Sequence, residues 1–244
     1  MNLSGNTVLL TGGSSGIGLA LAERLVRAGN QVIVTGRRDA LLAELRAKLP
    51  SVITIVSDMG DPRARAALAA EVSERFPALN VLINNAGIQR KLDLKAREPW
   101  EHTQDEIAIN LEGPIHLNAL LLPHLLEQPR AVIANVSSGL AFVPLSTVPI
   151  YSATKAALHS YTLSLRHQLR GTQVEVIEII PPAVVSNLGG SHDFGVPTAE
   201  YADSVLAQLA EGRPEVTYQF SAQTSQASRA ELDAIFARLN PVKA

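Results

Sequence analysis

The chain has 244 residues, 46% of them hydrophobic and 18% charged, and its formal net charge at pH 7 is −2. This charge and an aromatic content of 4% give no basic surface and few stacking side chains for a nucleic-acid partner. There is no cysteine, which excludes disulfides and thiolate chemistry and is compatible with a reducing compartment. No apolar run approaches the roughly 20 residues needed to span a bilayer, and the N-terminus lacks the pattern of a signal peptide. We therefore expect a cytoplasmic protein without a membrane partner.

Short apolar runs rich in β-branched residues alternate with longer helix-like segments. Strands that are apolar throughout are typical of a parallel sheet covered on both faces, and right-handed crossovers then give a doubly wound sheet. We predict an α/β Rossmann fold with helices on both faces of a parallel sheet, forming a single domain over residues 1–244 because no repeat or linker divides the chain. The expected strands are 7–10, 31–34, 52–56, 81–83, 131–134, 174–179 and, more weakly, 215–218, and the expected helices are 16–29, 39–49, 62–76, 103–127 and 150–170.

A glycine-rich loop, Thr11-Gly-Gly-Ser-Ser-Gly-Ile-Gly18, follows the first expected strand and leads into the first expected helix. Glycine lets the backbone approach a pyrophosphate closely, and the helix N-terminus offers unpaired N–H groups and the positive end of its dipole. An ordinary turn is the alternative for glycines alone, but the strand–turn–helix context favours a nucleotide site. The residues expected to bind the nucleotide here are Gly12, Ser14, Ser15, Gly16, Ile17 and Gly18.

Tyr151 and Lys155 stand four residues apart in the expected helix 150–170. They share a helix face, and a fixed positive charge lowers the pKa of a nearby phenol. Such a pair can exchange a proton with an alcohol oxygen, as a carbonyl/alcohol redox enzyme requires. By itself the spacing is common, and an exposed lysine packed on a surface tyrosine is the alternative. Ser138 lies thirteen residues before Tyr151 and is the third candidate.

An extended break in the alternating pattern covers residues 186–200. Its glycines and few apolar residues predict a mobile flap over a site. His192 lies in this segment, and we interpret it as a solvated loop histidine rather than a substrate contact. The histidines show no metal-binding spacing anywhere in the chain, so we expect no metal site.

Together, the motifs resemble those of the classical short-chain dehydrogenase/reductase family over nearly the full length. The resemblance implies an oxidoreductase that transfers a hydride between a nicotinamide nucleotide and a carbonyl compound or secondary alcohol. The matching residues are Thr11-Gly-x-x-x-Gly-x-Gly18, Asp58, Asn84-Asn-Ala-Gly87, Asn110, Ser138, Tyr151 and Lys155.

The resemblance also implies how the adenosine half of the cofactor is held. Asp58 would accept a hydrogen bond from the adenine amino group; its alternative role is a helix or turn cap ahead of the next helix. The expected adenosine contacts are Asp58, Met59, Asn85, Ala86 and Gly87.

The end of the second expected strand bears on the choice between NADP and NAD. In relatives that prefer NAD an acidic residue binds the ribose hydroxyl there, whereas this chain has Gly36 followed by Arg37 and Arg38. Guanidinium groups are well suited to a phosphate, so we expect NADP, with NAD as the less favoured cofactor. The alternative is that both arginines are merely solvated. Asp39 is expected to cap the next helix.

The resemblance implies a catalytic group of four residues. Ser138 would orient the substrate oxygen, and Tyr151 would exchange a proton with it. Lys155 would lower the pKa of Tyr151 and bind the nicotinamide ribose, while Asn110 would hold a water linked to Lys155. Ser137 is an adjacent candidate for the serine role, and an ordinary helix-surface amide is the alternative for Asn110.

One departure from the family pattern lies beside the expected nicotinamide. Many relatives have Pro-Gly after the sixth strand, but here Pro181 is followed by Pro182, which fixes φ and removes an N–H donor. We still expect Pro181, Val184 and Ser186 to contact the cofactor.

The expected substrate pocket is mainly apolar, which predicts a neutral ketone, aldehyde or secondary alcohol. The alternative is that these side chains simply pack beneath the flap. Ser138, Leu140, Tyr151 and Phe194 are the expected substrate contacts, and the pocket wall adds Gln89, Phe142, Pro144, Leu145, Val148 and Leu188.

Two other functions share this fold. A nucleotide-binding regulator or redox sensor would keep the site with little turnover, and an isomerase or epimerase would hold its nicotinamide tightly. The complete catalytic set favours the reductase. By resemblance we also expect a homodimer or homotetramer formed through the segments 103–127 and 150–170.

Overall fold

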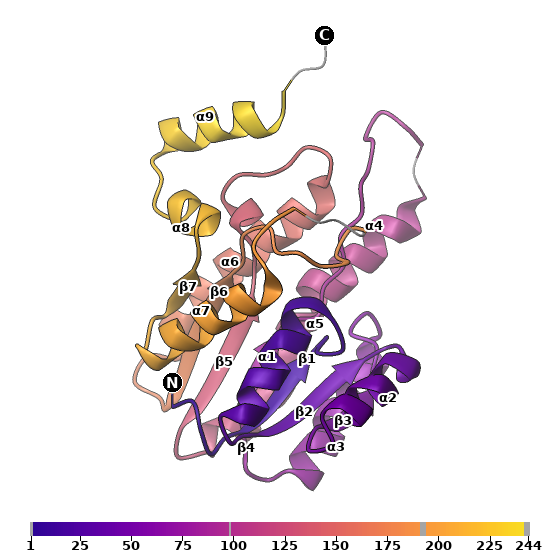
Figure 1. The fold of residues 1–244 in the computed structure, drawn as a ribbon, viewed down its shortest axis with the longest axis vertical. Coiled ribbons are helices and arrows are strands. Elements are labelled where there is room, and N and C mark those ends of the chain that lie inside the picture. Colours follow the sequence, from indigo (N-terminus) through magenta and orange to yellow (C-terminus); the bar gives the residue numbers. More distant parts are fainter. Residues whose placement is uncertain (1, 98, 191–193, 242–244) are drawn as a thin grey trace.

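The computed structural model describes residues 2–97, 99–190 and 194–241. Seven strands form one parallel sheet in the order β3-β2-β1-β4-β5-β6-β7, as Figure 1 shows. This confirms the predicted doubly wound sheet, including the weak seventh strand. The strands are β1 Thr7–Thr11, β2 Gln31–Gly36, β3 Ile53–Val56, β4 Leu79–Asn84, β5 Ala131–Val136, β6 Val174–Ile180 and β7 Glu215–Thr217.

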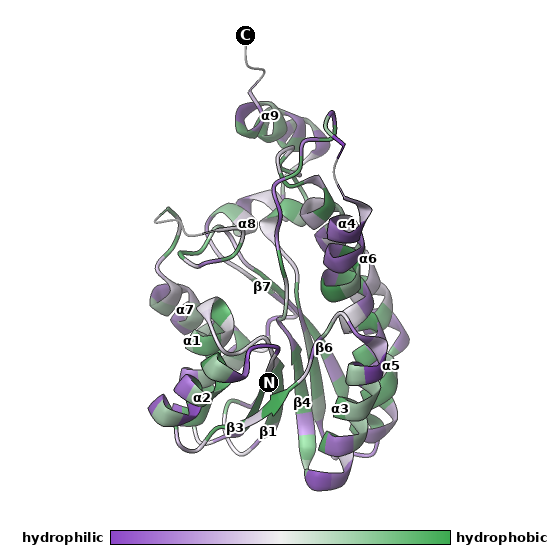
Figure 2. Ribbon diagram, turned by 90° about the vertical axis from the view of Figure 1, so that its right-hand side faces the viewer, coloured by the Kyte–Doolittle hydropathy of each residue, from purple (hydrophilic) through white to green (hydrophobic). Residues whose placement is uncertain are grey.

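Helices cover both faces of the sheet, as Figure 2 shows. On one face α1 (Gly16–Arg27), α2 (Asp39–Lys48) and α7 (Thr198–Ala210) bury apolar side chains in one core cluster. On the other face α3 (Pro62–Arg75), α5 (Gly113–Leu126) and α6 (Pro149–Gln168) pack against a second cluster. The remaining helices are α4 Trp100–Ile107, α8 Phe220–Thr224 and α9 Arg229–Leu239, with a 3₁₀ turn at Gly139–Ala141.

The segment predicted as one helix over 103–127 is interrupted. α4 ends at Ile107, and a π-helical turn, Ala108–Glu112, joins it to α5. Pro114 has no N–H to donate to the carbonyl of Asn110, so the regular ladder of helical hydrogen bonds cannot run through this point. The turn carries Asn110, one of the predicted site residues.

Two other expectations about the helices are corrected. Asp39 is the first residue of α2 and not its cap, because Arg38 precedes the helix and no side-chain cap bond forms there. Helix α7 begins at Thr198, inside the predicted flap segment 186–200. In the described part of the chain, no helix is both long and apolar enough to cross a membrane.

The strand order reverses between β1 and β4, since β2 lies on one side of β1 and β4 on the other. Ligands of such sheets bind at the carboxyl ends of the strands beside this switch point. The predicted glycine loop follows β1 and the Asn85–Gly87 segment follows β4, so the fold brings these two motifs together.

Candidate active site

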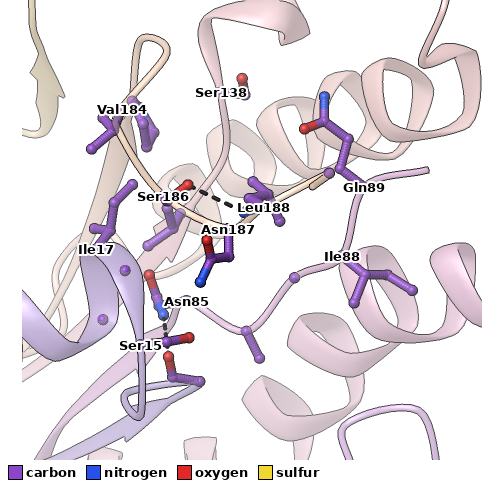
Figure 3. A pocket seen from close by; sticks show the side chains of 18 of the residues that line it. Ser15, Ile17, Asn85, Ile88, Gln89, Ser138, Val184, Ser186, Asn187 and Leu188 are labelled. Carbon is purple, nitrogen blue, oxygen red and sulfur yellow. Dashed lines mark hydrogen bonds between the residues drawn. The ribbon is translucent and has the colours of Figure 1, made fainter. Parts of the chain in front are cut away.

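A cavity of about 1190 Å³ runs along the carboxyl ends of the strands. Figure 3 shows part of its wall, where Ser15 and Ile17 of the first loop and helix lie across from Val184 and Ser186. Nearly all of the predicted site residues line this cavity, although they come from segments far apart in the sequence. Those that do are Gly12, Ser14, Ser15, Gly16, Ile17, Gly18, Arg37, Arg38, Asp58, Met59, Asn85, Ala86, Gly87, Ser138, Leu140, Tyr151, Lys155, Pro181, Val184, Ser186 and Phe194.

The glycine loop packs tightly against the segment after β4. A Cβ on Gly12 would lie 2.7 Å from the Ala86 Cα, and one on Gly18 would lie 2.4 Å from the Gly12 carbonyl oxygen. Asn85 holds the two segments together, because its side-chain amide donates to the carbonyls of Thr11 and Gly12 at 2.9 and 3.1 Å. The glycines are therefore required by the close approach of backbone atoms.

Asp58 lies in the cavity wall and also stabilises a turn. Its Oδ1 accepts a hydrogen bond from the Gly60 N–H at 2.9 Å. The cap of α3 is Asp61, whose carboxylate accepts from the Arg63 N–H at 2.8 Å. The turn-cap role of Asp58 is thus present, while its helix-cap role is not, and its predicted contact with adenine stays a prediction.

Ser138, Tyr151 and Lys155 come together where β5 meets α6. Ser138 acts on the Tyr151 phenol and lowers its pKa, and the Lys155 ammonium lies 5.5 Å from the centre of the tyrosine ring. Lys155 Nζ donates to the Val136 carbonyl at 2.7 Å. Ser137 also lines the cavity, but its hydroxyl is buried and has no hydrogen-bond partner among the described residues. The geometry favours Ser138 for the serine role.

Tyr151 and Lys155 are 7% and 3% exposed, so the interpretation as a surface pair is wrong. Burial raises the pKa of Tyr151 to about 12, with the hydrogen bond from Ser138 opposing it and the charge of Glu106 adding to it. Burial lowers the pKa of Lys155 to about 8, against the charge of Glu178. The expectation of a lowered tyrosine pKa is therefore wrong for this structure, because loss of solvation outweighs the favourable contacts of the phenolate.

Asn110 is fully buried beside the cavity wall rather than in it. Its Oδ1 accepts from the Ile88 N–H at 2.8 Å, and its Nδ2 donates to the Ile88 carbonyl at 2.8 Å. A Cβ on Gly87 would lie 3.3 Å from Asn110 Oδ1 and 3.7 Å from Lys155 Nζ. The surface-amide interpretation is wrong, and Asn110 and Lys155 both lie close to Gly87. The water-holding role of Asn110 stays a prediction.

The substrate end of the cavity agrees in part with the predicted wall. Gln89, Leu140, Leu145, Leu188 and Phe194 line it. Phe142, Pro144 and Val148 do not. Phe142 instead packs on the His159 ring, with centroids 4.7 Å apart. His192 lies outside the described residues. Asn187 and Glu200 line the cavity from within the predicted flap segment 186–200. Sequence reasoning missed three wall residues that follow β7, which are Gln219, Phe220 and Leu239.

The segment predicted as a flap is joined to the rest of the chain by backbone hydrogen bonds near its ends. Val185 N–H donates to the Val196 carbonyl at 2.9 Å, and Val196 N–H donates to the Ala183 carbonyl at 2.9 Å. Between these bonds, Leu188 N–H donates to Ser186 Oγ at 3.3 Å (Figure 3). These bonds hold Ala183 and Val185 against Val196. Leu188, which lines the cavity, lies between these fixed points in the sequence.

Comparison with known proteins identifies the family. The family model described as short chain dehydrogenase matches residues 6–193. The chain belongs to the short-chain dehydrogenase family. One relative, the uncharacterized oxidoreductase DltE of Bacillus subtilis, is 47% identical to this chain over 98% of each chain.

Two further relatives of this short-chain dehydrogenase carry a cofactor in their names. The NADP-dependent 3-hydroxy acid dehydrogenase YdfG of Salmonella typhi is 34% identical over 72% of each chain. A crystal structure of a short-chain dehydrogenase from Burkholderia cenocepacia in complex with NADP superimposes with a TM-score of 0.85. It is 28% identical and covers 98% of this chain and 99% of its own.

Proposed function

We propose that this short-chain dehydrogenase transfers a hydride between NADP(H) and a neutral carbonyl compound or secondary alcohol. The observation that carries the proposal is the juxtaposition of Ser138, Tyr151 and Lys155 in one cavity with the glycine loop. Reduced nicotinamide supplies the hydride, and the protein supplies binding, orientation and a proton.

The residues present fit a dinucleotide. The loop backbone cannot carry a Cβ at Gly12 or Gly18 without overlap, which is the close packing that backbone binding of a pyrophosphate requires. The first turn of α1 follows this loop, and in the described structure no side chain caps it. Its N–H groups are therefore available to a phosphate. Asp58 and Asn85 would hold the adenosine half, and Val184 and Ser186 the nicotinamide half.

The chain's own groups favour proton donation. With its pKa raised to about 12 by burial, Tyr151 is protonated at neutral pH and can donate its proton to a substrate oxygen. Ser138 would hydrogen-bond the same oxygen and orient it. Lys155, with a pKa of about 8, is mainly charged at pH 7 and stabilises the negative charge left on the tyrosine. The free enzyme is therefore in the protonation state that carbonyl reduction requires at neutral pH.

The preference for NADP is supported by the charges at the end of β2. Arg37 and Arg38 are exposed and line the cavity. Gly36 lies beside them, and a Cβ there would be 3.3 Å from Ser14 Oγ. Two arginines and the Ser14 hydroxyl thus lie at the end of β2, where this chain has Gly36 and no carboxylate. Guanidinium groups in such a place suit a ribose phosphate.

The substrate end supports an uncharged substrate. Arg90 lines the cavity, but its guanidinium is held by helix α4, donating to the His102 carbonyl at 2.9 Å and to Asp105 at 3.1 Å. A substrate carboxylate would have to compete with this ion pair. The segment around Leu188 and Phe194 is proposed as the flap over this part of the cavity.

Fluorescence titration with NADPH and NADH, followed by absorbance of the reduced nicotinamide across a panel of ketones and aldehydes, tests the proposal. Tighter binding of NADPH and turnover of a neutral panel member are expected. Turnover that proceeds equally with NADH would contradict the cofactor assignment, and binding without turnover across a broad panel would favour the regulator.

A further inference from the structure

A buried carboxylate lies behind the proposed catalytic group. Glu178 is on β6, is fully buried, and faces α6. Its Oε2 accepts a hydrogen bond from His159 Nδ1 at 2.8 Å. Its Oε1 is also buried and has no hydrogen-bond partner among the described residues. A carboxylate in such a place is stable only if a positive charge compensates it.

His159, which pairs with Glu178, is one such charge when it is protonated, and Glu178 raises its pKa. Lys155 is a second cation on the same helix. It lies one turn before His159 on α6 and is 3% exposed. The hydrogen bond described for its ammonium goes to an uncharged group, the Val136 carbonyl, at 2.7 Å. The charge of Glu178 acts on Lys155 and opposes the effect of burial on its pKa. Each buried charge thus offsets the cost of burying the other.

We propose that Glu178 is the buried counter-ion of Lys155, that His159 orients it, and that it acts as a positioning residue for proton transfer at Tyr151. The consequence for turnover rests on the proposed function; the ionic coupling itself does not. Glu178 supplies no atom to the substrate in this proposal. It keeps the lysine charged, and the charged lysine stabilises the tyrosinate left after proton donation.

Other charged groups act on the same cluster. Glu106 of α4 acts on Tyr151, and Tyr201 of α7 is coupled to the same phenol. Glu215 of β7 and Arg166 of α6 act on His159 with opposite signs. Glu178 is the group whose charge raises the pKa of Lys155, so its removal should lower that pKa further.

Nuclear magnetic resonance of protein labelled at the lysine ε-carbon measures this coupling directly. The Lys155 signal is identified by its loss in Lys155→Arg. We expect Glu178→Gln to lower the pKa of Lys155 by about one unit or more, and Glu178→Asp to restore part of the shift. Glu175→Gln, an exposed position on the same strand, should leave the pKa where it is. An unchanged Lys155 pKa in folded Glu178→Gln would overturn the proposal.

A reciprocal measurement guards against a Glu178 variant that fails to fold. If Lys155 and His159 share one carboxylate, removing the lysine charge relieves repulsion on the imidazolium. The pKa of His159, followed by its imidazole signals, should therefore rise in Lys155→Met. An unchanged His159 pKa would refute the shared counter-ion.

Cofactor binding and turnover separate this proposal from the proposed function. Wild-type protein that binds no NADPH would refute the proposed function, while the Lys155 and His159 titrations would still decide the ionic coupling. Where turnover is found, the high-pH limb of the rate profile should move to lower pH in Glu178→Gln by the same shift that resonance measures. A purely structural role would lower the rate at every pH without moving the limb.

Discussion

Replacing Gly12 by alanine tests the proposed phosphate loop, and Gly5 offers a matched control. Both glycines have left-handed backbone, with φ of 68° at Gly12 and 69° at Gly5. A Cβ on Gly12 would lie 2.7 Å from the Ala86 Cα, whereas a Cβ on Gly5 would have nothing within 4 Å. The two substitutions share the backbone cost and differ in the overlap between the loop and the segment after β4.

The magnitudes follow from these two effects. A non-glycine residue in left-handed backbone costs about 1–2 kcal/mol, and an extra carbon forced into filled space costs about 1–3 kcal/mol. We expect the free energy of unfolding to fall by about 1–2 kcal/mol in Gly5→Ala and by about 2–5 kcal/mol in Gly12→Ala. NADPH affinity should fall about tenfold or more in Gly12→Ala and stay unchanged in Gly5→Ala.

Urea denaturation measures the stability of the two variants, and fluorescence titration measures their affinity for NADPH. Equal losses of stability in the two variants would show that the loop accommodates the added carbon at Gly12 without destabilising the protein. Unchanged NADPH affinity in a folded Gly12→Ala protein would refute the placement of the pyrophosphate on this loop.

Three further predictions concern charge. Arg37→Ala should weaken NADPH binding about tenfold or more and leave NADH binding nearly unchanged; equal weakening of both in fluorescence titrations would refute the phosphate contact. A ketone should have a kcat/KM about tenfold or more above that of a carboxylate analogue of equal size. The reason is that Arg90 is already paired, so a buried substrate carboxylate would lack a partner. Steady-state rates for the two compounds test this prediction. The pKa of Lys155 in the folded protein is about 8, below its ordinary value of 10.5. Between these two pH values the unfolded chain binds more protons than the folded protein. This lysine therefore makes the free energy of unfolding rise with pH in that range. The stability difference between wild type and Lys155→Met should therefore change by about 3 kcal/mol in favour of wild type from pH 7 to 10.5; urea denaturation that shows a constant difference would refute the lowered pKa.

Local signals were sufficient for the sheet and for the glycine loop that lines the cavity. Apolar runs predicted every strand within a few residues, and the loop from Thr11 to Gly18 lies where a strand–turn–helix pattern puts it. The interrupted helix at Asn110 was not predicted, although Pro114 was a visible reason for it. Helices α7, α8 and α9 were also missed, α9 despite the capping box that Ser228 and Glu231 form.

Properties that depend on burial could not be obtained from the sequence. The four-residue spacing of Tyr151 and Lys155 predicted their proximity but not the sign of the tyrosine pKa shift, which is set by the loss of solvent around the phenol. Glu178 and His159 are nineteen residues apart, and only the packing of α6 on β6 makes them partners. Gln219 and Leu239 reach the cavity through the C-terminal segment, where no motif marked them.

The most direct test of the central claim compares NADPH oxidation by wild type and Tyr151→Phe with a neutral ketone that the wild type reduces. The account predicts that Tyr151→Phe binds NADPH as the wild type does and reduces the ketone at least about 10²-fold more slowly, because the proton donor is missing. A Tyr151→Phe protein with near-wild-type turnover would contradict the proposed chemistry.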